Sequence, residues 1–322
     1  MCGGSRSGSL LVISGGAARR RVVSDIAKSL SGELAAAVER SGESVVRVGG
    51  RRVPSTGIVW SGEGVIVTTH HSLEWDEGIE VGLADGRAVP ASVVGRDPTT
   101  DVAALRIAAS GLAAPAWADP EPVRVGHLVL AVSRPGRSVR GSLGIVSVRA
   151  DAWRTPMGGR LDHYLQTDVA RHPGFSGSLL VTAGGEAIGL NTSGLLRGAT
   201  LAVTASTLGR VVGALLAHGQ VRRGYLGLGT YPVRLPAELE RAVGQAAALL
   251  IVSVEPDTPA ARAGLQLGDA LAQFDGHPLH HPSDLLPLLD GERIGAEVPL
   301  RIVRAGEVRD VKVTVGTRET RA

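Results

Sequence analysis

The chain has 322 residues, more than one hydrophobic core usually serves, so we expect two or three domains. Apolar residues make up 43% and charged residues 20%, a balance that excludes extended disorder. The net charge is +3, and the 34 basic residues are interspersed with 31 acidic ones. Nucleic-acid binding needs a basic stripe, so the sequence indicates no nucleic-acid partner. The densest basic runs are interpreted as solvated surface: Arg19–Arg21, Arg51–Arg52 and Arg222–Arg223.

The chain has one cysteine, Cys2, which excludes an internal disulfide framework and a cysteine-rich zinc site. His277, His280 and His281 flank prolines without acidic or thiol neighbours, so we expect surface histidines, no metal and no cofactor. No run approaches 18 apolar residues, which predicts no membrane span. Because the Leu10–Ile13 stretch is short and precedes the arginines, we recognise no signal peptide. We expect a cytoplasmic protein, with a periplasmic or secreted one as the alternative.

Residues 1–28 are rich in Gly, Ser and Arg and predict a loose arm, followed by a helical pattern over Leu30–Glu39. From Ser44 onward, short runs of Val, Ile and Thr are separated by Gly, Pro and Asp turns. This spacing is typical of antiparallel barrels or sandwiches and argues against a parallel α/β fold. The predicted strands are Ser44–Val48, Thr56–Trp60, Gly64–Thr69, Ile79–Leu83, Val89–Val94, Ala103–Ile107, Leu128–Val132, Gly141–Val148, His163–Gln166, Ser178–Val181 and Ala187–Asn191.

A helix predicted over Thr207–His218 ends at Gly219, which marks a domain boundary. A second unit of about a hundred residues follows, the usual size of a compact domain. Its predicted strands are Ala248–Val254, Ala270–Phe274, Glu297–Arg304 and Glu307–Val315, and its predicted helices are Pro259–Ala263 and Ser283–Leu289.

Ser176 stands between glycines in the stretch Arg171-His-Pro-Gly-Phe-Ser-Gly-Ser-Leu-Leu180, a pattern found both in turns and around nucleophiles. A nucleophilic serine needs a base, and the base needs an orienting acid. The acid candidates, Asp97 and Asp101, share one turn before an apolar strand. The candidate bases are His70, His71, His127, His163 and His172. The chain order His, Asp, Ser is the order found in chymotrypsin-like double barrels.

Three segments resemble the HtrA-type serine proteases, which are trypsin-like proteases with a C-terminal PDZ domain: Gly64–Leu73, Gly95–Leu105 and Gln166–Gly177. The resemblance selects His71, Asp101 and Ser176 as the catalytic triad. It implies a mainly β protein, with a chymotrypsin-like double β-barrel followed by a small α+β PDZ domain. The expected divisions are an arm and helix at 1–43, a protease domain at 44–218 and a PDZ domain at 224–316.

The nucleophile loop departs from the family pattern Pro-Gly-Asn-Ser-Gly-Gly-Pro at Phe175, Ser178 and Leu179. Gly174 is retained, so the N–H groups of Gly174 and Ser176 are the expected oxyanion hole. The resemblance implies a serine endopeptidase of the protein quality control type, acting on unfolded or C-terminally recognised polypeptides. If Phe175 twists the loop, the alternative is a weakly active homologue that serves as a PDZ peptide-binding scaffold or chaperone.

Arg171 lies five residues before Ser176, where the family usually carries an aliphatic residue that walls the specificity pocket. A guanidinium there predicts binding of a substrate carboxylate. The alternative is that Arg171 turns to solvent and stacks near His172 or Phe175, leaving an open pocket. The strand after the nucleophile resembles the family's cleft-lining strand and adds the expected substrate-binding residues Asn191, Thr192 and Gly194.

The segment Gly224–Gly229 resembles the carboxylate-binding loop of HtrA-type PDZ domains, although glycines there also suit a plain hairpin. A peptide C-terminus would add a strand to an open sheet edge, with its carboxylate on successive backbone N–H groups. The expected peptide-binding residues are Tyr225, Leu226, Gly227 and Leu228. The partners implied are polypeptide substrates, peptide C-termini and further copies of the chain in a homo-oligomer, a trimer by resemblance.

Overall fold

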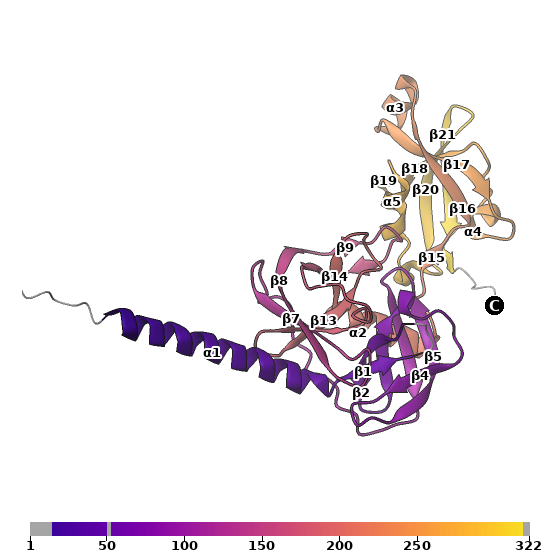
Figure 1. Ribbon diagram of the computed structural model, residues 1–322. Coiled ribbons are helices and arrows are strands. Elements are labelled where there is room, and N and C mark those ends of the chain that lie inside the picture. Colours follow the sequence, from indigo (N-terminus) through magenta and orange to yellow (C-terminus); the bar gives the residue numbers. More distant parts are fainter. Residues whose placement is uncertain (1–14, 50–52, 318–322) are drawn as a thin grey trace, which may run out of the picture.

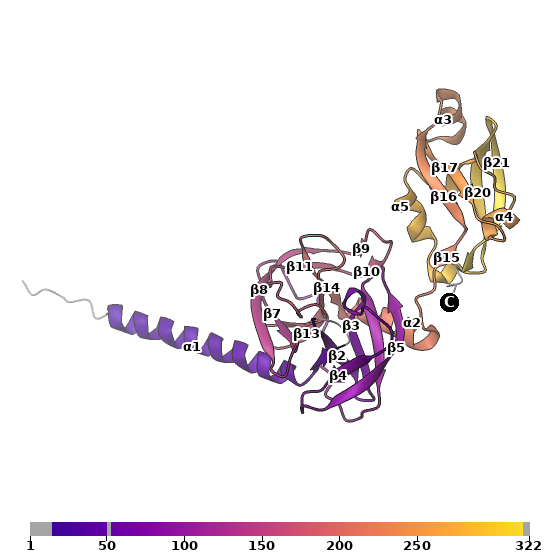
Figure 2. The same ribbon diagram turned by 45° about the vertical axis from the view of Figure 1, so that its right-hand side comes forward.

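The computed structural model describes residues 15–49 and 53–317. A long helix leads into two β-barrels that lie side by side, and a smaller mixed unit follows (Figure 1). Figure 2 shows the same arrangement from another side, with the helix extending away from the barrels. The mainly β fold predicted from the sequence is confirmed.

The first barrel is a closed six-stranded sheet with the strand order β1-β2-β3-β6-β5-β4. All neighbouring strands are antiparallel, and β1 pairs with β4 to close the barrel. Its strands are β1 (Val45–Val48), β2 (Ser55–Ser61), β3 (Val65–Thr69), β4 (Ile79–Gly82), β5 (Ala88–Asp97) and β6 (Val102–Ile107).

The second barrel has the strand order β11-β14-β13-β12-β7-β8 and closes through the pairing of β8 with β11. A small hairpin of β9 (Trp153–Arg154) and β10 (Arg160–Leu161) stands beside it. The barrel strands are β7 (Leu128–Ser133), β8 (Arg140–Ala150), β11 (Tyr164–Thr167), β12 (Leu179–Thr182), β13 (Ala187–Thr192) and β14 (Thr200–Thr204).

Successive side chains of a strand point to opposite faces, and in β3 both faces are apolar. On β3, Ile66 points into the first barrel's own core, whereas Val65 and Val67 join a cluster shared with the second barrel. Helix α2 (Ala205–His218) packs against β5, β6, β13 and β14, and its Leu208 and Leu215 are fully buried in the shared cluster. The catalytic candidates therefore stand on two barrels whose relative position is fixed by a common core.

Helix α1 (Gly15–Gly42) begins well before the helix predicted at Leu30, so the expected loose arm is wrong for residues 15–28. Ala and Arg dominate residues 17–21, and both have high helix propensity, which outweighs the glycines that suggested a loop. Ala37, near the C-terminal end, is fully buried, whereas Ile26 is 63% exposed. Residues 1–14 of the predicted arm lie outside the described part of the chain.

Arg134, which follows β7, is a buried cation that bonds to carbonyls rather than to a carboxylate. Its guanidinium donates to Gly42 O (2.7 Å) at the end of α1 and to Val45 O (2.9 Å) at the start of β1. Its backbone N–H donates to Thr56 Oγ1 (3.1 Å), and Thr56 Oγ1 donates to Gly174 O (2.8 Å). Burial lowers the pKa of Arg134. This side chain ties the helix end to the first barrel.

The C-terminal unit is a sheet of order β16-β17-β18-β20-β21 around its own apolar core, in which Phe274 and Leu300 are fully buried. Strand β19 pairs with β18, and β15 pairs with β22. The strands are β15 (Gly224–Tyr225), β16 (Leu228–Arg234), β17 (Ala247–Val254), β18 (Ala270–Phe274), β19 (His277–Pro278), β20 (Glu297–Arg304), β21 (Glu307–Thr314) and β22 (Gly316–Thr317). The α-helices are α3 (Ala237–Val243), α4 (Pro259–Arg262) and α5 (Pro282–Leu285). The 3-10 helices of the unit are η2 (Leu286–Leu288) and η3 (Gly291–Arg293).

Candidate active site

Asp101, His71 and Ser176 form one hydrogen-bonded row across the seam between the barrels. His71 lies in a 3-10 turn, η1 (His70–Ser72), directly after β3. Asp101 Oδ2 lies 2.7 Å from His71 Nδ1, and His71 Nε2 lies 3.1 Å from Ser176 Oγ. A carboxylate accepts the Nδ1–H proton, so Nε2 is left as the acceptor that faces the serine hydroxyl.

Asp101 is held by more than the imidazole. Its Oδ1 accepts the backbone N–H of His71 (2.9 Å), and Thr192 Oγ1 donates to its Oδ2. The side chain is almost fully buried. Its backbone has φ +58°, in the left-handed region that an aspartate tolerates better than most residues. These bonds fix the position of the carboxylate beside the histidine ring.

Asp97, the other acid candidate, builds the turn that presents Asp101. Its Oδ1 accepts from the N–H (3.2 Å) and the hydroxyl (2.6 Å) of Thr99, and its Oδ2 accepts from Thr100 Oγ1 (2.7 Å). The bond from Thr99 N is the local backbone to side-chain bond typical of aspartate at a turn, and the two threonine hydroxyls add side-chain bonds to it. Both carboxylate oxygens of Asp97 are therefore bonded within the turn, whereas the carboxylate of Asp101 faces His71.

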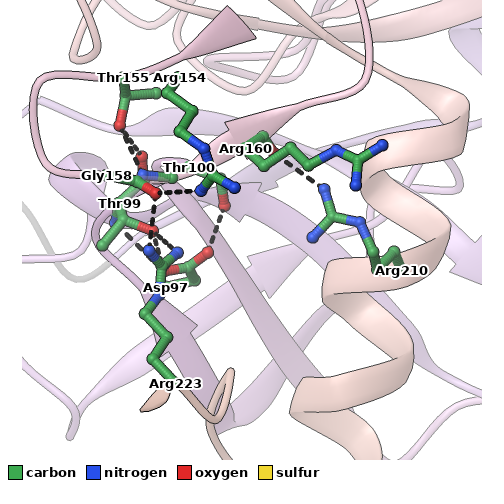
Figure 3. A network of polar contacts seen from close by, with 10 residues as sticks. Asp97, Thr99, Thr100, Arg154, Thr155, Gly158, Arg160, Arg210 and Arg223 are labelled. Carbon is green, nitrogen blue, oxygen red and sulfur yellow. Dashed lines mark hydrogen bonds and ion pairs between the residues drawn. The ribbon is translucent and has the colours of Figure 1, made fainter. Parts of the chain in front are cut away.

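The same turn is held from outside by two other segments (Figure 3). Thr155 Oγ1, in the β9–β10 hairpin, donates to Thr99 O (2.7 Å). Arg223, in the linker between α2 and β15, donates to Thr99 Oγ1 and to Gly158 O (2.9 Å), and lies 3.7 Å from the Asp97 carboxylate. The linker to the C-terminal unit thus bonds directly to the turn that carries Asp101.

The hairpin is anchored in turn to α2. Arg210 of α2 donates to Arg160 O (2.8 Å), as Figure 3 shows. Arg154 of the hairpin donates to Gly158 O (3.3 Å), and burial together with repulsion from Arg160 and Arg223 lowers its pKa.

His70 does not belong to the row, although it adjoins His71. Its Nδ1 is buried and has no hydrogen-bond partner within the described residues. Burial lowers the pKa of His70, against the opposing attraction of Asp101, so the ring is neutral near pH 7. The imidazole that reaches Ser176 is that of His71.

The chain around Ser176 forms a type II turn. Phe175 N donates to His172 O (3.1 Å), with Pro173 at the second position and Gly174 at the third with φ +86°. A side chain at Gly174 would meet Pro135 at 2.4 Å, so the position requires glycine. Phe175 turns into the core of the second barrel and is 7% exposed, so its side chain lies away from the cleft.

The two N–H groups expected to stabilise an oxyanion, those of Gly174 and Ser176, are without a hydrogen-bond acceptor among the described residues. In contrast, the neighbouring N–H groups of Phe175, Gly177 and Ser178 all donate to backbone carbonyls. The pair is thus left available to an incoming group, as an oxyanion hole requires.

Two hollows meet at Ser176. Arg171, Asn191 and Thr192, three of the predicted substrate-binding residues, line one of them. Its other lining residues are Val169, Ala170, His172, Phe175, Ser176, Ser178, Ser193 and Thr200. The second hollow is lined by Val53, Pro54, Ser55, His71, Ser72, Glu74, Pro173, Gly174 and Ser176.

The fourth predicted substrate-binding residue, Gly194, backs the triad. A Cβ built on Gly194 would lie 2.6 Å from His71 Nδ1 and 2.7 Å from Asp101 Oδ2. Sequence reasoning missed Ser178, which is fully buried in the pocket wall and bonds to Asn191 Nδ2 (3.1 Å). It also missed Ser193, whose hydroxyl lies 3.5 Å from Ser176 Oγ. Neither serine carries a sequence signal of its own.

In the C-terminal unit, residues Tyr225–Leu228 lead into β16, the edge strand of the sheet, with α5 beside it. The carbonyls of Leu226 and Gly227 accept from Ala260 N and Glu255 N, both at 2.9 Å. Gly227 has φ +82°, and a side chain there would meet Thr258 at 2.4 Å. The Tyr225 hydroxyl donates to the Glu255 carboxylate (2.5 Å). The loop is thereby held in shape at the open edge of the sheet.

No group of three or more potential ligands for a metal ion occurs among the described residues. Of the helices that the structure describes, none combines the length and the apolar character needed to cross a membrane. The runs Arg19–Arg21 and Arg51–Arg52 carry no described side chains.

Family models match two parts of the chain. Residues 55–190 match the trypsin-like peptidase domain, and residues 224–315 match the PDZ domain. The first runs from β2 into β13, and the second covers the C-terminal unit from β15 to the end of β21.

Curated relatives are named probable periplasmic serine endoproteases that are DegP-like. The protein of Halomonas elongata is 36% identical over 272 residues, covering 83% of this chain and 57% of its own length. One from Pseudomonas putida is 33% identical, with 81% and 55% covered. The chain thus spans little more than half the length of these relatives. Their names do not support our cytoplasmic expectation.

Solved structures match over nearly their whole chains. The HtrA-type protease AlgW with a decapeptide is 28% identical, with a TM-score of 0.71, and the match covers 89% of this chain and 99% of that one. AlgW with a tripeptide is 30% identical, with a TM-score of 0.69 and coverage of 89% and 98%. The serine endoprotease from Yersinia pestis is 28% identical, with a TM-score of 0.70 and coverage of 88% and 97%. Since the likeness runs through both barrels and the PDZ domain together, the chain belongs to the HtrA-type protease family.

Proposed function

We propose that the protein is a serine endopeptidase in which Ser176 is the nucleophile, His71 the general base and Asp101 its orienting carboxylate. The observation that carries the proposal is the row of hydrogen bonds from Asp101 to His71 (2.7 Å) and from His71 to Ser176 (3.1 Å). Both distances lie within the range in which a base can take a proton from a nucleophile. The curated relatives, named serine endoproteases, do not favour the alternative of an inactive scaffold.

The reaction would proceed in two halves. Ser176 Oγ adds to the scissile carbonyl carbon while its proton passes to His71 Nε2, and the carbonyl oxygen takes the negative charge. The N–H groups of Gly174 and Ser176 would stabilise that oxyanion. As the C–N bond breaks, His71 gives its proton to the leaving amine, and an acyl group remains on Ser176. Water, deprotonated by His71, then adds to the acyl carbon, and Ser176 leaves with that proton restored.

The substrate in this proposal is a polypeptide that is unfolded or presents a free C-terminus to the PDZ domain. An extended chain suits a cleft with a hollow on each side of Ser176. The edge strand β16 offers a place for a further strand, and the adjoining Tyr225–Leu228 loop would bind the terminal carboxylate. The structures of AlgW with a decapeptide and with a tripeptide concern a relative of this chain and support the same class of ligand.

We also propose a periplasmic location and a homo-oligomeric state, most simply a trimer. The names of the curated relatives support the location. Ile26 and Leu30, exposed on α1, support an intermolecular contact, because large apolar side chains in one row on a helix are usually covered. Light scattering at micromolar concentration tests the oligomer, and a monomer would contradict it.

The activity is tested with a fluorophosphonate probe and an unfolded protein such as casein. The wild-type chain is expected to be labelled on one residue and to cleave casein, whereas Ser176→Ala is expected to do neither. Removing a triad nucleophile costs on the order of 10⁶ in kcat. Equal labelling of the two proteins would refute the assignment of Ser176.

A further inference from the structure

Arg171 lines the hollow beside Ser176, and its charge has no counterpart. The side chain is exposed, and within residues 15–49 and 53–317 its guanidinium makes no hydrogen bond or ion pair. None of the other lining residues is an Asp or a Glu. An arginine that is not neutralised presents five N–H donors in a planar fork, which matches the two oxygens of a carboxylate.

The remaining wall is more polar than a pocket for aliphatic side chains requires. Hydroxyl or amide groups come from Ser178, Asn191, Thr192, Ser193 and Thr200. Asn191 is 3% exposed; its amide N–H donates to Ser178 Oγ, and its Oδ1 has no partner among the described residues. A ligand with an N–H or O–H donor would satisfy Oδ1, and the Ser178 hydroxyl keeps its own proton for a ligand that accepts a hydrogen bond.

The neighbouring aromatic ring does not hold Arg171 away from the hollow. Phe175 pairs edge-to-face with His172, with their ring centroids 5.4 Å apart, and its side chain is buried in the second barrel. The stacking of Arg171 on these rings, which the sequence left open, is not observed. The guanidinium therefore stays available to whatever enters beside the nucleophile.

We propose that this hollow selects substrates with Asp or Glu on the amino side of the cleaved bond, and that Arg171 is the residue that sets this specificity. The inference rests on the proposed peptidase activity. The substrate carboxylate would accept two N–H bonds from Arg171, with the hydroxyl groups of Ser178 and Thr200 available to its remaining lone pairs. A neutral amide of the same shape retains the packing but loses the charge, so Gln against Glu isolates the contribution of Arg171.

The test compares matched peptide substrates that differ at that one residue: Asp, Asn, Glu, Gln, Val and Lys. In the wild type, kcat/KM is expected to be about tenfold or more higher for Glu than for Gln, and for Asp than for Asn, as hydrogen bonds to charged groups provide. In Arg171→Gln the two members of each pair become equal, and in Arg171→Glu the preference passes to Lys. Because the Arg171 side chain is exposed to solvent, salt screens its charge, and high salt is expected to reduce the wild-type preference for acidic substrates.

Arg197 provides the matched control, since it is exposed in the loop after Ser193 but does not line the hollow. Arg197→Gln removes the same charge and is expected to keep the acidic preference. If Arg197→Gln lost the acidic preference to the same extent, the preference would come from the overall positive charge around the hollow, and this would overturn the role of Arg171. A preference for Val that Arg171→Gln leaves unchanged would overturn it as well.

Fluorophosphonate labelling separates this inference from the activity on which it rests. All three arginine variants are expected to label at Ser176 at rates close to the wild type, because the probe needs the triad and not the side-chain hollow. Labelling of the wild type without acidic preference would refute the specificity alone. Absence of labelling in a folded wild-type chain would refute the peptidase itself.

Discussion

Arg223, in the linker to the PDZ domain, donates a hydrogen bond to the hydroxyl of Thr99, two residues before Asp101. The contact joins parts of the chain that are 124 residues apart. Through this contact, the position of the linker affects the geometry of the turn that carries Asp101.

Loss of this bond is expected to loosen the turn without unfolding the barrel. We predict that Arg223→Ala lowers kcat/KM by about threefold to tenfold, the effect of one net hydrogen bond. The rate of hydrolysis of a short peptide substrate at concentrations below KM measures it. Arg222→Ala is the control, because Arg222 is exposed and its side chain makes no hydrogen bond or ion pair within the described residues. A similar loss in both variants would point to net charge.

The two adjacent histidines are expected to behave very differently. His71→Ala removes the base and lowers kcat on the order of 10⁶-fold. His70→Gln removes a neutral ring that does not reach Ser176, and the expected change in kcat/KM is less than about threefold. Casein cleavage by both variants, with circular dichroism to confirm folding, checks the ranking. The reverse order would mean that His70 carries the chemistry.

Gly194 is expected to tolerate no side chain. A methyl group there would lie 2.6 Å from His71 Nδ1, so either the loop or the imidazole must move. A displacement of about 1 Å in a catalytic group costs about 10²-fold in rate, which is the loss predicted for Gly194→Ala. Single-turnover kinetics measures it. In Gly209→Ala, a helical position with open space around it, activity stays unchanged and the helix gains stability.

The PDZ domain is expected to lose stability in acid through Asp269. Burial raises the pKa of this carboxyl, but bonds from Arg304 (2.6 and 2.7 Å) and Gln266 N (2.8 Å) outweigh it, so the pKa lies below its ordinary 3.8. Because the pKa of Asp269 is lower in the folded protein, the ionised carboxylate stabilises the fold at pH values above 3.8. This stability is lost as the pH falls through the lowered pKa.

Asp269→Asn is expected to cost roughly 1–3 kcal/mol of unfolding free energy at pH 7, with a smaller difference at pH 3. Hydrogen exchange of the β18 and β20 amides in the full chain measures the stability of the PDZ domain separately from that of the barrels. Asp310→Asn is the control, because Asp310 pairs with Arg301 on the exposed surface. A difference for Asp269→Asn that is independent of pH would refute the ionic explanation.

The sequence predicted every strand of the two barrels except β14, because strand alternation and short turns are local signals. It also predicted the row of His71, Asp101 and Ser176. Choosing Asp101 over Asp97 required the family resemblance, since both acids share one turn. Sequence reasoning did not find β14, β16 or α3. Thr200–Thr204 runs directly into α2 with no turn residue to mark its end, and the Pro232 in β16 argues against a strand.

The contacts of Arg223 and of Arg134 could not be predicted. Each joins segments that are far apart in the chain, and an arginine at a linker or after a strand is ordinary surface composition. The turn at Ser176 carried more information than we used. The order His172-Pro173-Gly174 is the preferred sequence of a type II turn, which already implied that Phe175 leaves the loop unstrained.

The bonds of Arg134 have a consequence for how the molecule opens. They connect the end of α1 at Gly42, through Thr56, to the carbonyl of Gly174 in the nucleophile turn. Segments joined by a buried donor tend to open as one cooperative unit. We therefore expect the turn before Ser176 and the end of the N-terminal helix to open together, so that fraying of the helix end makes this turn accessible to proteases.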